Sequence, residues 1–461
     1  MGKPNQMVRT RFAPSPTGEL HVGGARTALF NWLLAKKTGG AVVLRVEDTD
    51  KERSKVEFES AFISGLSWLG VDFDEGPHTG GEFGPYRQSE RTAIYKEYVG
   101  KLLDTGAAYR CYCTKERLSE LRAGQVKGGI APGYDGLCRQ LKEAPEKEVD
   151  FVIRFHVKGK EVRFIDGLRG ERVFDAALIS DFIIMNSKGD AAFLFASALD
   201  DALMEITDVI RGDDHISNTP GQILLLEALG LKAPAYTHIP LILGADRKPL
   251  SKRTQSASLE SLKRDGFLPE AVLNTIARLG WAPHKGARHK GEKDALLTLE
   301  ELTGLFDLEV LSKSASVFDL KRLKRFNKDA LGKADPELLL DSISSWFKKI
   351  DRQWLLIAIT LVKEEAESTK DIVRLLSPLI GVLTITSEAS KILTEPQAVD
   401  VVKALADEIK ASEKLDQQAY LDIIDALKKK TERTGKALFM PVRAALTGCT
   451  SGIELSKVMR L

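Results

Sequence analysis

Apolar positions in the first hundred residues alternate between short continuous runs and helical repeats. Residues 8–13 form a β-prone run, and a helical pattern follows over residues 25–33. Residues 41–48 read as a second buried strand that ends in carboxylates, and residues 57–69 and 91–103 as further helices. Strands that alternate with helices predict a doubly wound α/β fold, in which ligands bind at the carboxyl ends of parallel strands.

Residues 108–196 break this rhythm and predict an insertion that interrupts the sheet. They contain short strands near residues 151–156 and 162–165 and a glycine-rich turn at residues 166–170. The α/β pattern then resumes with a strand at residues 208–212. A helix at 222–229 and a strand at 237–243 follow.

The C-terminal third has a different pattern. From residue 250 to about 330 the chain is mainly helical, apart from a polar loop at 281–294. Beyond about residue 335 nearly every apolar residue recurs at helical spacing, which predicts an all-helical terminal domain. We therefore predict four parts. They are residues 1–107 with 197–243, residues 108–196, residues 244–333 and residues 334–461.

Composition adds limits rather than a function. The 461 residues carry a formal net charge of +2, so bulk charge does not indicate a nucleic-acid partner. No stretch approaches the roughly 18 apolar residues of a membrane span. The first residues lack the apolar core of a signal peptide, which predicts a cytoplasmic protein with no membrane partner. Four cysteines do not suggest a disulfide framework.

The first loop carries the most informative residues. Pro14 and Gly18 shape a sharp turn, and His21, Gly23 and Gly24 stand where the first helix begins. Unpartnered N–H groups and the helix dipole favour an anion there, and glycines let it approach the backbone. An imidazole can stabilise charge that develops on the α-phosphate of a triphosphate. The alternative is a capped helix with a surface histidine.

A basic loop follows the strand predicted at 237–243. Residues 246–253 hold two lysines and two arginines, including Lys252 and Arg253. This pattern suits a mobile clamp on a leaving pyrophosphate, although most basic runs are solvated loops.

A third set of residues suits an acidic amino acid. Arg11, Ser15, Glu47 and Arg211 each lie at a predicted strand end or in the adjoining loop. A guanidinium pairs bidentately with a carboxylate, and a carboxylate pairs with an ammonium group. The alternative for a strand-end arginine is a structural ion pair.

The two loops together resemble the signatures of class I aminoacyl-tRNA synthetases, in the variants used by glutamyl-tRNA synthetases. Residues 11–26 are similar to the His-Ile-Gly-His signature, and residues 250–253 are similar to the Lys-Met-Ser-Lys-Ser loop. Pro249 stands at the first lysine position of that loop, with Lys248 one residue earlier, which puts loop mobility in doubt. The resemblance implies catalytic roles for His21 and Lys252. It implies ATP binding by Pro14, His21, Gly23, Gly24, Lys252 and Arg253.

The resemblance also implies a glutamate site made of Arg11, Ser15, Glu47 and Arg211. In it, Arg211 matches the residue that contacts the side-chain carboxylate of glutamate. Phe193 stands where the family usually has tyrosine, and Ser197 where asparagine is common. Loss of the phenol hydroxyl predicts glutamate binding weaker by about 0.5–1.5 kcal/mol.

The cysteines predict a metal site. Cys111 and Cys113 are followed by Cys138, and a thiolate cluster in a reducing compartment more often binds zinc than forms disulfides. Many glutamyl enzymes have histidine where this chain has Gln140, whereas Tyr134 resembles an alternative fourth ligand of some relatives. The alternative is three inert cysteines in a decayed site.

We therefore expect an enzyme that uses ATP with Mg²⁺ to join L-glutamate to glutamate tRNA through glutamyl-adenylate. By resemblance, residues 1–107 and 197–243 form a Rossmann-like catalytic domain and 108–196 bind the acceptor end of tRNA. Residues 244–333 contact the tRNA stem and 334–461 bind the anticodon. We expect a monomer, and whether glutamine tRNA is also charged stays open.

Three alternatives remain at this point. A glutaminyl enzyme shares both signatures, but such relatives carry β-barrels at the C-terminus. A truncated paralogue that modifies a tRNA base lacks the helical domain. An inactive tRNA-binding paralogue is suggested by Phe193, Gln140 and Pro249.

Overall fold

In the computed structural model, the described residues are 7–141, 150–159, 161–250, 258–283 and 295–461. The chain divides into two compact units. The first comprises Met1–Ser261 and Leu273–Asp319, and the second comprises Leu262–Val272 and Leu320–Leu461. The four-part division predicted from the sequence is finer than this one and stays a prediction.

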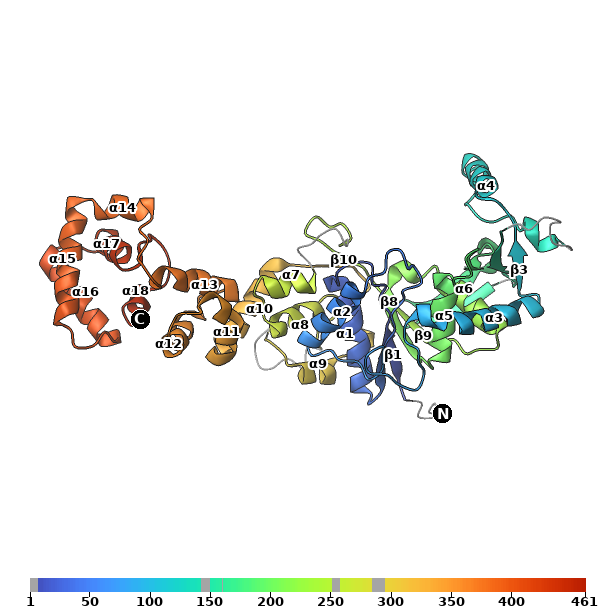
Figure 1. Cartoon of the computed structure of the whole chain (residues 1–461), viewed down its shortest axis with the longest axis horizontal. Helices are drawn as coiled ribbons and strands as arrows, with labels where there is room; N and C mark the ends of the chain where they lie inside the picture. The colour runs from blue at the N-terminus through green and yellow to red at the C-terminus, as the bar shows by residue number, and fades with distance from the viewer. Residues whose placement is uncertain (1–6, 142–149, 160, 251–257, 284–294) are drawn as a thin grey trace. The chain divides into compact units, whose positions relative to one another are not determined.

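The first unit is built on parallel strands, as the alternating pattern predicts. Strand β1 (Arg9–Phe12) pairs in parallel with β2 (Ala41–Leu44), and β8 (Asp208–Gly212) pairs in parallel with β9 (Ala235–Ile239). Helix α1 (Val22–Lys37) lies against β1, β2 and β8, so the first strand pair and β8 share one helical cover (Figure 1). The mixed α/β fold class with a parallel sheet is therefore confirmed.

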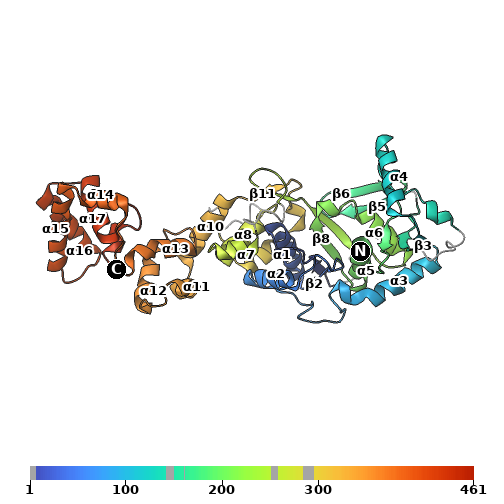
Figure 2. The ribbon, with the colours of Figure 1, turned by 45° about the horizontal axis from the view of Figure 1, so that its top comes forward.

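The segment predicted to interrupt the sheet instead adds two strands to the sheet of β8 and β9. Strand β5 (Glu161–Asp166) forms an antiparallel hairpin with β6 (Gly170–Asp175), and Asp166 pairs in parallel with Tyr236 of β9. Figure 2 shows the hairpin beside α6 (Thr219–Ala228). Other strands of the segment form a separate antiparallel sheet, namely β3 (Ala108–Cys111), β4 (Val152–Phe155) and β7 (Ile183–Met185).

The apolar clusters among the described residues of the first unit include the following two. One packs α5 (Phe193–Leu203) and α6 against the sheet of β3, β4 and β7, with Phe195 and Leu199 fully buried. The other lies between Val43, Val209 and Tyr236. The remaining elements of four or more residues that lie wholly within the unit, apart from the 3₁₀ turns, are α2 (Val56–Trp68), α3 (Thr92–Asp104), α4 (Lys115–Lys127) and α9 (Leu299–Leu305).

The described residues of the second unit form helices, as the 3.6-residue spacing predicts. The buried clusters among its described residues include one among α11 to α13 and one among α15 to α17. Within the described residues, no helix is both long enough and apolar enough to cross a membrane. Helices that begin within or enter the unit are α7 (Leu259–Arg264), α8 (Pro269–Ala277), α10 (Leu320–Lys333), α11 (Pro336–Ile343), α12 (Arg352–Val362), α13 (Thr369–Leu376), α14 (Ser387–Leu393), α15 (Pro396–Ala411), α16 (Gln417–Thr431), α17 (Lys436–Thr447) and α18 (Leu455–Val458).

Candidate functional site

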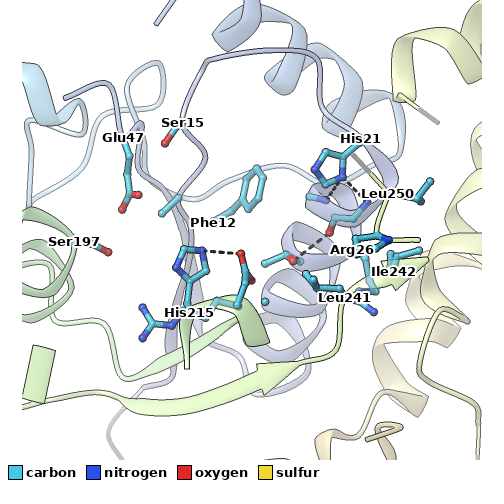
Figure 3. A pocket seen from close by; sticks show the side chains of 18 of the residues that line it. Phe12, Ser15, His21, Arg26, Glu47, Ser197, His215, Leu241, Ile242 and Leu250 are labelled. Atoms are coloured by element: carbon cyan, nitrogen blue, oxygen red, sulfur yellow. Dashed lines mark hydrogen bonds and ion pairs between the residues drawn. The ribbon is translucent and has the colours of Figure 1, made fainter. Parts of the chain in front are cut away.

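A cavity of about 480 Å³ opens at the carboxyl ends of β1 and β8, beside the start of α1 (Figure 3). This is the sheet edge at which a doubly wound fold binds ligands. Pro14 is not among the lining residues, but its carbonyl accepts the Glu47 N–H at 3.0 Å. The predicted residues that line the cavity are Arg11, Ser15, His21, Gly23, Gly24, Glu47, Phe193 and Arg211.

His21 caps the helix that begins at the cavity. Its Nδ1 accepts hydrogen bonds from the backbone N–H groups of Gly23 and Gly24 at 3.0 and 3.2 Å. An imidazole nitrogen that accepts cannot carry a proton, so a neutral His21 carries its proton on Nε2. The cap therefore leaves a single N–H of the ring as a donor.

This cap corrects one expectation. The sequence predicts free N–H groups at the start of α1, whereas Gly23 and Gly24 already donate to His21. The glycines serve close packing instead, because a Cβ on Gly23 would lie 2.8 Å from the His21 ring and a Cβ on Gly24 2.6 Å from Leu20. The backbone N–H groups of both glycines are thus occupied by the cap.

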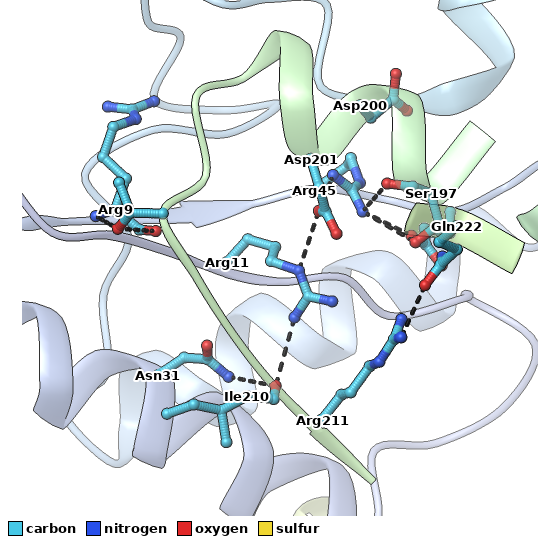
Figure 4. A network of polar contacts seen from close by, with 12 residues as sticks. Arg9, Arg11, Asn31, Arg45, Ser197, Asp200, Asp201, Ile210, Arg211 and Gln222 are labelled. Carbon is cyan, nitrogen blue, oxygen red and sulfur yellow. Dashed lines mark hydrogen bonds and ion pairs between the residues drawn. The ribbon is translucent and has the colours of Figure 1, made fainter. Parts of the chain in front are cut away.

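A buried charge network forms another part of the wall (Figure 4). Asp201 Oδ1 accepts from Arg11 Nε at 3.1 Å and from Arg45 at 2.7 Å. Arg45 also donates to Glu47 Oε1 at 3.0 Å. Arg45, Glu47 and Asp201 are each 5% exposed or less, and the network orders Arg11 and Glu47 at the cavity. Burial raises the pKa of Glu47 even though Arg45 and Arg11 oppose the shift, so a cation beside Glu47 would stabilise its charged form.

Arg211 reaches the cavity from the end of β8 and is held by neutral groups. It donates to His238 Nε2 at 3.1 Å, to Thr219 Oγ1 at 2.8 Å and to Gln222 Oε1 at 2.7 Å. Its guanidinium also lies 5.0 Å from the centre of the Tyr236 ring. Burial, with a smaller contribution from Arg11, lowers the pKa of Arg211 to about 10.

The ion pairs formed by the described residues include none to Arg211. Within the described part of the chain, Arg211 therefore does not form the structural ion pair that was the alternative for a strand-end arginine. A buried cation held only by neutral acceptors is a favourable place for an anionic ligand.

Phe193 begins α5 and packs against a histidine that the sequence analysis did not select. The rings of Phe193 and His215 lie 5.6 Å apart, and both line the cavity. Burial lowers the pKa of His215, which Asp214 opposes and Arg211 reinforces. Ser197 also lines the cavity, and its hydroxyl lies 3.4 Å from Arg45.

Further lining residues were not selected from the sequence, although several of them lie within the two signature segments. Arg26 and Thr27 line the cavity one helical turn after Gly23, and this offset of three and four residues from Gly23 was the signal that could have found them. The others depend on the tertiary arrangement of distant segments. They are Phe12, Ala13, Gly212, Asp214, Leu241, Ile242, Pro249 and Leu250.

The second predicted loop is described only at its two ends. Ser251, Lys252 and Arg253 lie outside the described residues. Before them, Leu250 lines the cavity and donates its N–H to the carbonyl of Ile242 in β10 (Ile242–Leu243). After them, Ser258 forms an isolated bridge with His21. The described chain thus leaves and re-enters beside the His21 end of the cavity.

The predicted metal ligands come together away from the cavity. The Sγ atoms of Cys111, Cys113 and Cys138 lie within 4.8 Å of one another, and Cys113 and Cys138 are 3.5 Å apart. The Tyr134 hydroxyl lies 3.4 Å from Cys111 Sγ and 3.5 Å from Cys113 Sγ. Tetrahedral zinc with Zn–S bonds of about 2.3 Å needs sulfurs about 3.8 Å apart, so this donor set fits the ion.

Two family models match the chain. One is described as "tRNA synthetases class I (E and Q), catalytic domain" and matches residues 7–325. The other is described as "Anticodon binding domain" and matches residues 336–461. The two matches cover the cavity and most of the helical unit.

Similar proteins match along nearly the whole chain. The glutamate–tRNA ligase of Natranaerobius thermophilus is 41% identical over 472 residues, which cover 98% of this chain and 95% of that protein. That of Bacillus subtilis is 40% identical over 475 residues, with 98% and 96% coverage. A crystal structure of a glutamate tRNA ligase from Elizabethkingia meningosepticum, in complex with its amino acid, gives a TM-score of 0.85 at 30% identity. It covers 99% of this chain and 96% of that one.

Proposed function

Because the chain belongs to the family of class I tRNA synthetases for glutamate and glutamine, we propose that the cavity beside His21 is where ATP and L-glutamate react. The activity is the ATP-dependent attachment of glutamate to tRNA. The α-carboxylate of glutamate attacks the α-phosphate of ATP, which forms glutamyl-adenylate and releases diphosphate. A terminal ribose hydroxyl of tRNA then takes the glutamyl group and releases AMP.

The charged wall around Arg211 is the glutamate end of the proposed site. Arg211 lines the cavity with its guanidinium held by neutral acceptors, which supports pairing with the side-chain carboxylate. Glu47 is a buried carboxylate whose charged form needs a cation, which supports contact with the ammonium group of glutamate. Arg11, Ser15 and Phe193 complete the proposed pocket.

The start of α1 is the ATP end. His21 lines the cavity beside the start of α1, which supports a role for its imidazole in stabilising charge that develops on the triphosphate in the transition state. Lys252 and Arg253 are proposed to clamp the leaving diphosphate, with Lys252 sharing the catalytic role of His21. Pro14, Gly23 and Gly24 shape the same end, and Mg²⁺ enters with ATP.

The observation that carries the proposal is the buried Arg211, which lines the cavity among neutral acceptors. Replacement of Arg211 tests the proposal. An Arg211→Met variant should raise the KM for glutamate by about 100-fold or more, because a buried charged hydrogen-bond pair is lost. Its KM for ATP should stay within about threefold, since the residues proposed to bind ATP are those at the start of α1 and in the second loop. An unchanged KM for glutamate would show that another group reads the side chain.

Transfer RNA is the third substrate, after ATP and L-glutamate, and the helical unit fits it. We assign residues 334–461 to anticodon binding, 108–196 to the acceptor end and 244–333 to the stem. The helical C-terminal unit argues against the glutaminyl alternative, whose C-terminus is built from β-barrels, and against the truncated paralogue, which lacks the unit. Aminoacylation of purified glutamate and glutamine tRNAs side by side tests whether only the first is charged.

The cysteine cluster is proposed to hold a structural zinc ion. Cys111, Cys113 and Cys138 supply three thiolates, and the position of the Tyr134 hydroxyl supports it as fourth ligand in place of a histidine. Elemental analysis of purified protein should find about one zinc per chain, and Cys138→Ser should lose it. A zinc-free wild-type protein of full activity would favour three inert cysteines.

We also propose a monomer located in the cytoplasm. Light scattering of the purified protein and fractionation of cells test these two points separately. A dimer at micromolar concentration would contradict the first.

A further inference from the structure

The acceptor that holds Arg211 Nε is a fully buried histidine. Arg211 donates from Nε to His238 Nε2 at 3.1 Å. His238 is 0% exposed and Arg211 only 5%. An arginine Nε–H can only donate, so this contact requires that Nε2 of His238 carries no proton.

A buried aspartate fixes this protonation state of the ring. It lies on β5, which is far away in the sequence but is the neighbouring strand of the sheet. His238 Nδ1 lies 2.6 Å from Asp166 Oδ2, and Asp166 is 1% exposed. Asp166 also accepts the His238 backbone N–H at 3.1 Å and those of Leu168 and Arg169 at 2.9 and 2.8 Å. A carboxylate with four donors stays ionised and keeps the proton of His238 on Nδ1. Nε2 is thereby left as an acceptor.

We propose that Asp166 and His238 are positioning residues that hold Arg211 toward the side-chain carboxylate of the substrate without neutralising its charge. This inference rests on the proposed role of Arg211 in reading glutamate. A carboxylate placed directly against the guanidinium would pair with it and compete with the ligand. An imidazole gives the same direction to the side chain through a neutral acceptor.

The other contacts of Arg211 also orient its guanidinium without neutralising its charge. Thr219 Oγ1 and Gln222 Oε1 accept from the terminal nitrogen at 2.8 and 2.7 Å, so every partner of the guanidinium named above is formally neutral. Tyr236 stacks on His238 with ring centroids 6.1 Å apart, which restrains the imidazole plane. Asp166 lies on β5, so the segment predicted as an insertion supports the glutamate end of the site.

Two substitutions of His238 distinguish the effect of losing the acceptor for Arg211 from the effect of losing the imidazole ring. The amide oxygen of His238→Gln reaches the position of Nε2, and Asp166 keeps its three backbone donors. The shorter side chain of His238→Asn reaches only the position of Nδ1. Both variants lose the stacking on Tyr236, so they are matched for the loss of packing. They differ in whether Arg211 Nε keeps an acceptor.

We expect His238→Asn to raise the KM for glutamate about 10- to 100-fold and His238→Gln to raise it no more than about threefold. The KM for ATP and the kcat should change little in either. Asp166→Asn should behave like His238→Asn. With its amide oxygen toward Leu168 and Arg169, the NH₂ group faces Nδ1 and the backbone N–H of His238. The ring then accepts on Nδ1 and carries its proton on Nε2.

The double variant Asp166→Asn with His238→Gln gives the sharpest result. The glutamine acceptor does not depend on Asp166, so we expect the double variant to recover a KM for glutamate close to that of His238→Gln. Damage to packing alone would accumulate instead. Thermal unfolding of each variant shows whether it is folded, and the Asp166 variant stands as an independent test if a His238 variant does not fold.

The outcomes distinguish this inference from the proposed function. Equal glutamate KM values for His238→Gln and His238→Asn, or no recovery in the double variant, would overturn the positioning role. If Arg211→Met itself leaves the KM for glutamate unchanged, the assignment of Arg211 fails. If Arg211→Met raises it while His238→Asn and Asp166→Asn do not, only the positioning role fails.

Discussion

Replacement of Gly23 by alanine tests whether His21 acts from the position that its helix cap imposes. The added Cβ would lie 2.8 Å from both Cε1 and Nδ1 of His21. Because such atoms are in favourable contact only from about 3.5 Å, the ring must move away by roughly 0.7 Å. The hydrogen bonds of 3.0 and 3.2 Å that Gly23 and Gly24 donate to Nδ1 would then exceed the normal range.

We expect this displacement to affect the rate more than the stability. A misplacement of about 1 Å can cost about 100-fold, so kcat/KM for ATP should fall by about 10- to 100-fold. The lost cap costs about 0.5–2 kcal/mol, and alanine in place of a helical glycine returns about 0.5–1 kcal/mol. The free energy of unfolding should therefore change by no more than about 1.5 kcal/mol.

Aminoacylation with labelled glutamate over a range of ATP concentrations measures the rate, and urea unfolding measures the stability. Gly100→Ala in α3 is the matched control, because nothing lies within 4 Å of its added Cβ. That variant should keep its activity and gain about 0.5–1 kcal/mol in stability. A folded Gly23→Ala enzyme with wild-type kcat/KM for ATP would refute the role given to the cap.

Three further predictions follow from the same geometry. His21→Asn should keep the helix cap and the stability of the protein, because its amide oxygen can accept from the two glycines. Its kcat should fall by about 100- to 1000-fold, because no donor reaches the phosphate. Thermal unfolding measures the stability, and steady-state kinetics measure the kcat. Phe193→Tyr should lower the KM for glutamate by about 2- to 10-fold through a regained hydroxyl, and an unchanged KM would contradict this. Burial lowers the pKa of His215 and of His238. Below about pH 6.5 the unfolded chain therefore binds protons that the folded chain does not. The free energy of unfolding should fall on acidification by up to about 1.4 kcal/mol per pH unit for each of the two histidines. Urea unfolding at pH 5.5 and 7.5 measures this, and His238→Gln should show a smaller difference between the two than the wild type.

The parts of the fold and site that follow from local pattern were predictable. The strand, turn and helix around His21 are encoded by neighbouring residues, and β1 and α1 begin close to the predicted positions. The strand-end rule then collects Arg11, Glu47 and Arg211 at one sheet edge, because parallel strands end together. Helical spacing likewise predicts the second unit.

What could not be predicted depends on register between distant segments. A single pairing of Asp166 with Tyr236 joins β5 to β9, and nothing in the pattern around Asp166 distinguishes this from an edge strand of an insertion. The same pairing brings Asp166 beside His238, 72 residues away in the chain. The side-chain cap of His21 was missed for another reason, since histidine is outside the usual set of N-cap residues.

The proposed pairing of Arg211 with the side chain of glutamate predicts selectivity over glutamine, and the physical basis is the cost of burying Arg211. Arg11 and Arg45 share Asp201, and Arg45 also contacts Glu47, so these guanidiniums are compensated inside the protein. Arg211 is buried among neutral acceptors, and the fall of its pKa from 12.5 to about 10 expresses a desolvation cost. At about 1.4 kcal/mol per pKa unit this cost is on the order of 3 kcal/mol. A ligand carboxylate relieves it with a charge and two acceptor oxygens, whereas the amide of glutamine brings no charge and one acceptor oxygen, and its NH₂ group cannot pair with a guanidinium that only donates. A site with a buried polar group that the wrong ligand leaves unpaired discriminates more strongly than one that only measures size. The neutral support by His238 preserves this difference, because a protein carboxylate in its place would satisfy Arg211 before any substrate arrives.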